Sequence, residues 1–272
     1  MTLSYLERVR ALNPLVHNIT NLVVAPFTAN GLLALGASPF MAYAHEEVAD
    51  VASIAGAVVL NIGTLDEKVV QAIRLAGQSA NAHHVPVVLD PVGAGATAYR
   101  TETVQQLVRD LRLTVLRGNV AEVAHVIGVP WSIKGVDAGE GEEDRISIAE
   151  RAAQQLACIV VITGQYDIVT DGYQTFLISN GHVLLTRVTG AGCLLSSVVG
   201  AFAAVARPGD DLLNSIVEAV AFYGVAAEQA AALTAQQGPG SFQMELLNQL
   251  AKVTPEFVSE HSQIRQIRGG AR

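Results

Sequence analysis

The most constraining feature of the chain is a set of four short aliphatic runs that alternate with amphipathic stretches. The runs are AVVLNIG (57–63), PVVLDPVG (86–93), LTVLRGN (113–119) and CIVVITG (158–164). They are rich in Val, Ile and Leu and lack the polar alternation of half-exposed strands, so each predicts a strand buried on both faces. The segments between them carry apolar residues at three- and four-residue spacing, which predicts βαβ units. We therefore expect a three-layer α/β sandwich with a mostly parallel central sheet and helices on both faces.

The pattern changes after Gly164. The following stretch, YDIVTDGYQTFLISNGHVLLTRV, contains Asp171-Gly172 and Asn180-Gly181. Such pairs are typical of tight turns between antiparallel strands. The stretch therefore predicts antiparallel strands joined by these turns and added to one edge of the sheet.

Three further predictions concern the organisation of the chain. Residues 134–145 are charged and glycine-containing and predict a mobile surface loop. The polar segment from Pro255 predicts a tail that frays. Neither an internal repeat nor a linker divides the sequence, so residues 1–272 are interpreted as a single domain.

Composition excludes several classes of partner. The formal net charge of −8 argues against nucleic acid, whose phosphates need a basic face. The net charge does not exclude nucleotide ligands, because N–H groups at a helix N-terminus can hold phosphates. Two cysteines, Cys158 and Cys193, suit a reducing cytoplasm. The N-terminal segment lacks a signal-peptide core, and the longest apolar run, from Cys193 to Ala206, is too short to span a membrane, so we expect a cytoplasmic protein.

Glycine-rich and polar segments follow the predicted parallel strands, where open α/β sheets build their sites. They are DPVGAGAT (90–97), RGN (117–119) with Glu122, and ITG (162–164), joined by TGAGC (189–193) at the start of a helix. Neither a P-loop GxxxxGK[ST] nor the dinucleotide GxGxxG spacing occurs. We therefore expect these segments to bind an anion without either of these two motifs.

Asp90 and Glu122 are the candidate metal-side carboxylates. Mg²⁺ prefers oxygen ligands, keeps several waters and bridges the phosphates of ATP, so one or two carboxylates suffice. The alternative is structural, with Asp90 forming a turn and Glu122 capping a helix.

The segment TGAGC before a small-residue helix resembles the anion-hole signature of ribokinase-like kinases, usually written GAGD. Together with NPLVHNITN, GASPFM, DPVGAGAT, LRGNVAEV, ITG and VTGAGCLLSS, it is similar to the hydroxyethylthiazole kinase family of thiamine salvage. The resemblance runs from about Leu12 to the final long helices. It implies a ribokinase-like fold, and an enzyme that uses ATP to phosphorylate the hydroxyl of 4-methyl-5-(2-hydroxyethyl)thiazole. It also implies a homotrimer with the thiazole site between subunits.

The resemblance implies two sets of ligand contacts. The substrate set holds Met41 and Gly190, to which we add Asn21 and Gly63. The ATP set holds Arg117 and Thr163, to which we add Asn119. A polarizable Met suits a flat sulfur heteroaromatic ring, and the guanidinium fork suits phosphate. Core packing is the alternative for Met41, and shaping a turn is the alternative for Asn21.

Cys193 occupies the position where the sugar kinases have a proton-accepting Asp. We expect the N–H groups of Gly190, Ala191, Gly192 and Cys193 to hold the transferring phosphoryl group as an oxyanion hole does. A helix N-terminus can lower the pKa of a thiol from about 8.5. Cys193 is therefore interpreted as a modest base or an orienter of the alcohol, with a small packing residue as the alternative.

Other functions stay open at this point. They are a vitamin kinase for hydroxymethylpyrimidine or pyridoxal, a repair enzyme for hydrated nicotinamide cofactors, and a non-catalytic nucleotide sensor. HNITN and Cys193 favour the thiazole kinase. The intact TGAGC and Asp90 argue against a sensor.

Overall fold

A nine-stranded sheet forms the centre of the computed structural model, which describes residues 4–131, 142–207 and 209–269. The strands lie in the order β2-β1-β3-β4-β5-β6-β7-β8-β9. They are β1 (Leu15–Ile19), β2 (Ser38–Phe40), β3 (Ala57–Asn61), β4 (Val87–Asp90), β5 (Val115–Asn119), β6 (Ile159–Thr163), β7 (Asp167–Thr170), β8 (Thr175–Ile178) and β9 (Ile264–Arg268).

The strands from β2 to β6 are parallel, and β6 to β9 are antiparallel. The prediction of a mostly parallel sheet with antiparallel strands at one edge is thus confirmed. Each of the four aliphatic runs contains one of the strands β3 to β6. The runs did not reveal β1 and β2, because β1 carries His17 and Asn18 among its apolar residues and β2 has only three residues.

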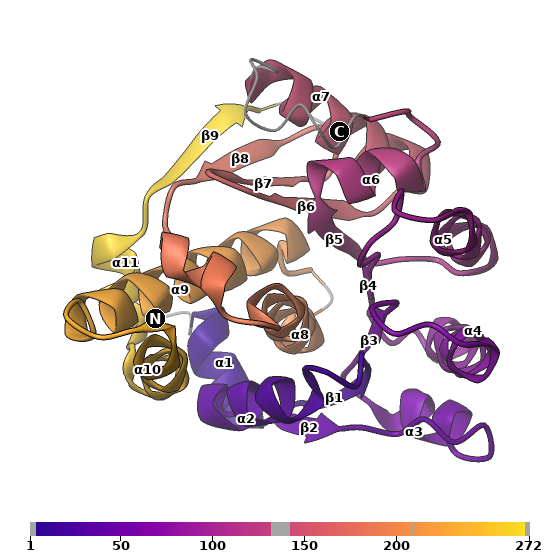
Figure 1. The fold of residues 1–272 in the computed structure, drawn as a ribbon, viewed down its shortest axis with the longest axis horizontal. Coiled ribbons are helices and arrows are strands. Elements are labelled where there is room, and N and C mark those ends of the chain that lie inside the picture. The colour runs from indigo at the N-terminus through magenta and orange to yellow at the C-terminus, as the bar shows by residue number, and fades with distance from the viewer. Residues whose placement is uncertain (1–3, 132–141, 208, 270–272) are drawn as a thin grey trace.

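Helices cover both faces of the sheet, as predicted (Figure 1). One face carries α3 (Val48–Ile54), α4 (Glu67–Ala82), α5 (Ala98–Asp110), α6 (Val120–Val126) and α7 (Glu142–Leu156). The other carries α1 (Tyr5–Leu12), α2 (Ala25–Leu35), α8 (Ala191–Val205), α9 (Leu212–Leu233) and α10 (Pro239–Lys252), with α11 (Pro255–His261) at its margin. Alternate strand residues supply the two cores, so that Val59 faces the α8 layer whereas Val58 and Leu60 face the α4 layer.

Two helices, α8 and α9, form the apolar centre of their layer. Helix α8 lies against β1, β3 and β4. Gly200 permits this approach, because a Cβ there would lie 2.8 Å from Cγ2 of Val59. Within the described residues, α9 is the single helix long and apolar enough to cross a membrane, but 72% of its most apolar window is buried inside the protein. Helix α9 is therefore a core helix.

The prediction of a strand after the Asn180-Gly181 turn is wrong. Residues Val183–Arg187 form a short 3₁₀-helix, η2, capped by His182, whose Nδ1 accepts a hydrogen bond from the N–H of Leu184. The free edge of β8 is taken instead by β9 from the end of the chain. The segment therefore has no edge to pair with and closes its hydrogen bonds locally.

The prediction of a frayed tail after Pro255 is also wrong, because α11 and β9 lie there. Asn180 anchors this segment: its Nδ2 donates to the carbonyl of His261 at 2.9 Å, and its Oδ1 accepts from the N–H of Gln263 at 2.6 Å. Of the predicted loop 134–145, residues 134–141 lie outside the described residues, and α7 begins at Glu142.

Candidate active site

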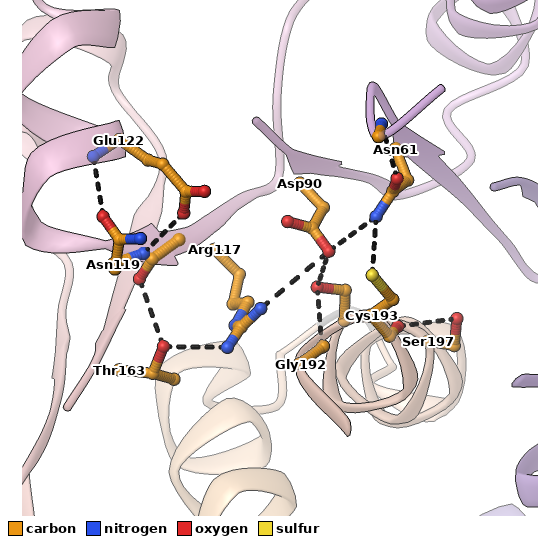
Figure 2. Close-up of polar contacts among 12 residues, drawn as sticks. Asn61, Asp90, Arg117, Asn119, Glu122, Thr163, Gly192, Cys193 and Ser197 are labelled. Carbon is orange, nitrogen blue, oxygen red and sulfur yellow. Dashed lines mark hydrogen bonds and ion pairs between the residues drawn. The ribbon is translucent and has the colours of Figure 1, made fainter. Parts of the chain in front are cut away.

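The predicted site residues lie on or just after the carboxyl-terminal halves of neighbouring strands, in the order of the sheet. In that order they are Met41 after β2, Asn21 after β1, Gly63 after β3, Asp90 on β4, Arg117 and Asn119 on β5, and Thr163 on β6. The amino end of α8 faces the middle of this row (Figure 2). The fold thus arranges these side chains along one edge, with Met41 at the border of the sheet and Thr163 at the far end.

Asp90 lies at the centre of the row and is 1% exposed. Its Oδ2 accepts hydrogen bonds from Asn61 Nδ2 and from Ser196 Oγ, both at 2.8 Å, and lies 3.9 Å from Nη1 of Arg117. Its Oδ1 is buried and has no hydrogen-bond partner among the described residues. Burial raises the pKa of Asp90, while Arg117 and the hydrogen-bond donors oppose that rise.

Glu122 and Asn119 form the capping box of α6. Asn119 Oδ1 accepts from the N–H of Glu122, and Glu122 Oε2 accepts from the N–H of Asn119. Glu122 Oε1 also accepts from the N–H of Gly93, which ties the DPVGAG loop to α6. Burial raises the pKa of Glu122, and the charge of Asp90 adds to the rise. Asn119 and Glu122 therefore stabilise the start of α6, which is the structural role given above as the alternative for Glu122.

Arg117 is largely buried between Asp90 and Thr163 (Figure 2). Its Nη2 donates to Thr163 Oγ1 at 2.8 Å, and its Nε is buried without a partner in the described part of the chain. A Cβ on Gly192 would lie 2.7 Å from Nη1. Glycine at this position therefore lets the end of α8 approach the guanidinium group.

The amino end of α8 presents open backbone donors. Gly190 is the N-cap residue, with φ of +90°, a conformation that glycine adopts without strain. The N–H of Ala191 donates to the carbonyl of Val188 at 3.3 Å, so this predicted donor is engaged. The N–H groups of Gly192 and Cys193 have no acceptor within the described ranges. Two adjacent donors at the positive end of the helix dipole are thus open to an anion.

Cys193 is held by two amide groups. Its Sγ accepts from Asn61 Nδ2 at 3.2 Å and from Asn21 Nδ2 at 3.4 Å. Burial, reinforced by the charge of Asp90, raises the pKa of Cys193 to about 11. Desolvation and the neighbouring carboxylate therefore outweigh the lowering that a helix N-terminus can give. The thiol is neutral at physiological pH.

Sequence reasoning missed Asn61 and Ser196, which complete the shell around Asp90. A signal for Asn61 exists in the sequence: it ends the run AVVLN as Asp90 ends the run PVVLD, and the two residues are register partners. Ser196 has no comparable signal, because it lies one turn inside a helix of small residues.

A cleft of about 590 Å³ opens beside Arg117 and Thr163. Gly192 and Tyr223 line it together with apolar side chains of η2 and α8. A larger cleft of about 820 Å³ lies at the opposite ends of β5 and β6 and contains none of the predicted residues. The smaller cleft is therefore the one that adjoins the predicted site residues.

One carboxylate oxygen, Oδ1 of Asp90, is available to a Mg²⁺ ion. The described residues contain no group of three or more His, Cys, Asp or Glu side chains able to hold a metal ion. Mg²⁺ does not need such a group, because it keeps several waters and shares ligands with phosphates. The free, buried Oδ1 of Asp90 offers the one carboxylate oxygen that such a site uses.

Comparisons with known proteins agree with this geometry. A model of the hydroxyethylthiazole kinase family matches residues 6–256. The structure of a hydroxyethylthiazole kinase from Pyrococcus horikoshii OT3 is similar at 41% identity and a TM-score of 0.87, covering 97% of this chain and 98% of that one.

More distant structures share the fold. A ribokinase-like superfamily protein from Enterococcus faecalis V583 is similar at 15% identity and a TM-score of 0.60, covering 93% of this chain and 90% of that one. An ADP complex of Bacillus subtilis pyridoxal kinase is similar at 15% identity and a TM-score of 0.58, covering 79% of this chain and 92% of that one. The prediction of a ribokinase-like fold is confirmed.

The raised pKa of Cys193 predicts slow alkylation. A shift from 9.0 to about 11 leaves roughly a hundredfold less thiolate at neutral pH. Iodoacetamide should therefore label Cys193 in the folded protein far more slowly at pH 7.5 than in the urea-unfolded protein. Mass spectrometry of the Cys193 peptide between pH 7 and 11, with circular dichroism to verify folding, should show the rate still climbing at the top of the range. A plateau reached below pH 8.5 would contradict the prediction.

Proposed function

The chain belongs to the hydroxyethylthiazole kinase family, and we propose that it transfers the γ-phosphoryl group of ATP to the hydroxyl of 4-methyl-5-(2-hydroxyethyl)thiazole. One observation carries the proposal: the order of side chains along the sheet edge. Cys193 and the open N–H groups of α8 lie at the middle of this edge, Arg117 and the 590 Å³ cleft lie on one side, and Asn21 lies on the other. In this proposal ATP, the transferring phosphoryl group and the alcohol would therefore lie in that order along the sheet edge.

The acceptor alcohol is proposed to bind beside Asn21, Gly63 and Cys193. A Cβ on Gly63 would lie 2.7 Å from Asn21 Nδ2, so the glycine keeps these two loops close. The neutral thiol of Cys193 is suited to orienting a hydroxyl rather than to removing its proton as a strong base. Gly190, the N-cap residue of α8, is proposed to contact the alcohol as well.

The transferring phosphoryl group is proposed to bind at the amino end of α8. The open N–H groups of Gly192 and Cys193 supply oriented donors where negative charge passes between oxygens. Arg117 borders the same point, and Thr163 holds its guanidinium group. Phosphoryl transfer with a loose transition state depends mainly on such positioning and charge neutralisation.

When bound with ATP, Mg²⁺ would neutralise the negative charge of the phosphates. Asp90 would hold it through the free Oδ1, and Glu122 would add negative charge nearby. Asp90 and Arg117 thus provide a metal-side carboxylate and a phosphate-side cation that lie next to each other, 3.9 Å apart. Asn119 is proposed to act on the ATP side through the cap that positions Glu122.

We further propose a cytoplasmic homotrimer of single kinase domains. Met41 follows β2 at the border of the sheet, whereas the hydrogen bonds to Cys193 come from Asn21 after β1 and from Asn61 on β3. Leu22 and Val23 follow β1 on the same side and are 75% and 69% exposed. An exposed apolar surface beside the acceptor side of the site supports a site shared between subunits. Two free cysteines support a reducing compartment.

A coupled ADP-release assay tests the proposed reaction. The purified chain with ATP and Mg²⁺ should release ADP with the thiazole alcohol, and the product should carry the phosphate on its side-chain oxygen by mass spectrometry. Hydroxymethylpyrimidine and pyridoxal serve as competing acceptors. Faster turnover of either competitor would assign the other vitamin-kinase activity, and no release with any alcohol would support a nucleotide sensor.

Arg117→Ala should raise the KM for ATP at least about tenfold, because a charge-assisted hydrogen bond to phosphate is lost. Arg117→Lys should recover only part of the loss, since the ammonium group cannot reproduce the fork. Initial rates at saturating thiazole alcohol measure both values. The exposed Arg109, in the last turn of α5, provides the matched control as Arg109→Ala. ATP kinetics unchanged in Arg117→Ala would remove Arg117 from the nucleotide site.

Sedimentation equilibrium should give a trimer. Leu22→Asp places a charge on the exposed apolar surface and should shift the equilibrium toward monomer while raising the KM for the thiazole alcohol, because the shared site opens. Exposed Tyr173, on the β7–β8 turn at the far side of the sheet, gives the control Tyr173→Asp. A stable and fully active monomer would contradict both the shared site and the role of Met41.

A further inference from the structure

Asn61 occupies the centre of the site without a role in the reaction as proposed so far. It ends β3, is 2% exposed, and is hydrogen-bonded to both Asp90 and Cys193 (Figure 2). A buried polar side chain at the carboxyl end of a parallel strand needs partners to offset its desolvation. Asn61 finds four.

The orientation of the Asn61 amide follows from an unambiguous donor. Its Oδ1 lies 2.9 Å from the backbone nitrogen of Gly63, which can only donate, and 3.1 Å from Asn21 Nδ2. The oxygen must therefore face Gly63 and Asn21. The Nδ2 group consequently faces the opposite side, toward the reacting groups.

The two hydrogens of Nδ2 are directed at two groups from different elements. One goes to Asp90 Oδ2 at 2.8 Å on β4, and the other to Cys193 Sγ at 3.2 Å on α8. An amide can accept two hydrogen bonds and donate two, so the hydrogen-bonding capacity of Asn61 is fully used. The planar amide of Asn61 thus links the Asp90 carboxylate and the Cys193 thiol to the loops of Gly63 and Asn21.

We propose that Asn61 is a positioning residue for phosphoryl transfer. Its acceptor half is anchored on the loops of Gly63 and Asn21, and its donor half holds Asp90 and Cys193 in place. The inference rests on the proposed function, in which these groups surround the acceptor hydroxyl and the phosphates. A shift of about 1 Å in such groups can lower rates by about 10²-fold.

Two substitutions separate the donor half from the rest of the side chain. Asn61→Asp keeps the shape and the acceptor for Gly63 but replaces the Nδ2 donors with an oxygen facing Asp90. Asn61→Leu keeps the approximate volume and removes all four hydrogen bonds. If Asn61→Leu fails to fold, Asn61→Asp alone decides.

Asn18 is the matched control. It is 0% exposed, lies on the neighbouring strand β1, and is also bonded to α8, through Ser197 Oγ at 2.7 Å. Its Nδ2 donates to the carbonyl of Val16 at 2.9 Å, away from Asp90 and Cys193. Asn18→Leu therefore removes a buried amide under the same helix without touching the reacting groups.

The experiment measures melting temperature, kcat and both KM values well below the melting temperature of each variant. We expect both Asn61 variants to lose about 10²-fold in kcat, with the KM for ATP within about threefold of wild type. Asn18→Leu should lower the melting temperature and keep kcat within about threefold.

Two results overturn the inference. One is a folded Asn61→Asp whose kcat stays within about threefold of wild type. The other is an Asn18→Leu that loses as much kcat as the Asn61 variants, since the effect would then be a general loosening beneath α8. If the unsubstituted chain phosphorylates the thiazole alcohol and either result is obtained, the inference about Asn61 fails while the proposed function stands. A wild-type chain that releases no ADP with the thiazole alcohol overturns the proposed function and this inference with it.

Discussion

The buried carboxylate of Asp90 is the constraint on which the organisation of the site depends. At 1% exposure, an ionised carboxylate is destabilising by several kcal/mol unless charged and hydrogen-bonding partners surround it. Asn61 on β3, Arg117 on β5 and Ser196 on α8 provide that surrounding. Because these partners come from three different elements, the carboxylate fixes the helix relative to the sheet.

Small residues make this arrangement possible. Gly200 lets α8 lie close against β3, and Gly192 lets its first turn reach the guanidinium of Arg117. Close approach brings the positive end of the helix dipole and two open N–H groups to the point where Asp90 and Arg117 meet. An anion at that point finds donors that are already oriented, which is what phosphoryl transfer requires.

The antiparallel half of the sheet serves the site in a different way. Since β9 occupies the edge of β8, the residues after Gly181 turn away from the sheet as η2 and supply Val183 and Leu185 to the wall of the cleft beside Arg117. Tyr223 on α9 completes the wall, and its hydroxyl donates to the carbonyl of Ala191 at 2.8 Å. The segment whose conformation was mispredicted is thus part of the cleft proposed for the nucleotide.

The sequence by itself determined the parallel strands β3 to β6, the strand positions of Asp90, Arg117 and Thr163, and the glycine-rich start of α8, because these depend on local patterns of apolar and small residues. Only the tertiary structure decided the rest. The contact of Asn61 and Ser196 with Asp90 depends on register between segments far apart in the chain. The conformation of η2 also depends on a distant segment, because β9 from the end of the chain pairs with β8 at the edge predicted for η2. The raised pKa of Cys193 was decided there too, because desolvation is a property of the folded surroundings rather than of the motif.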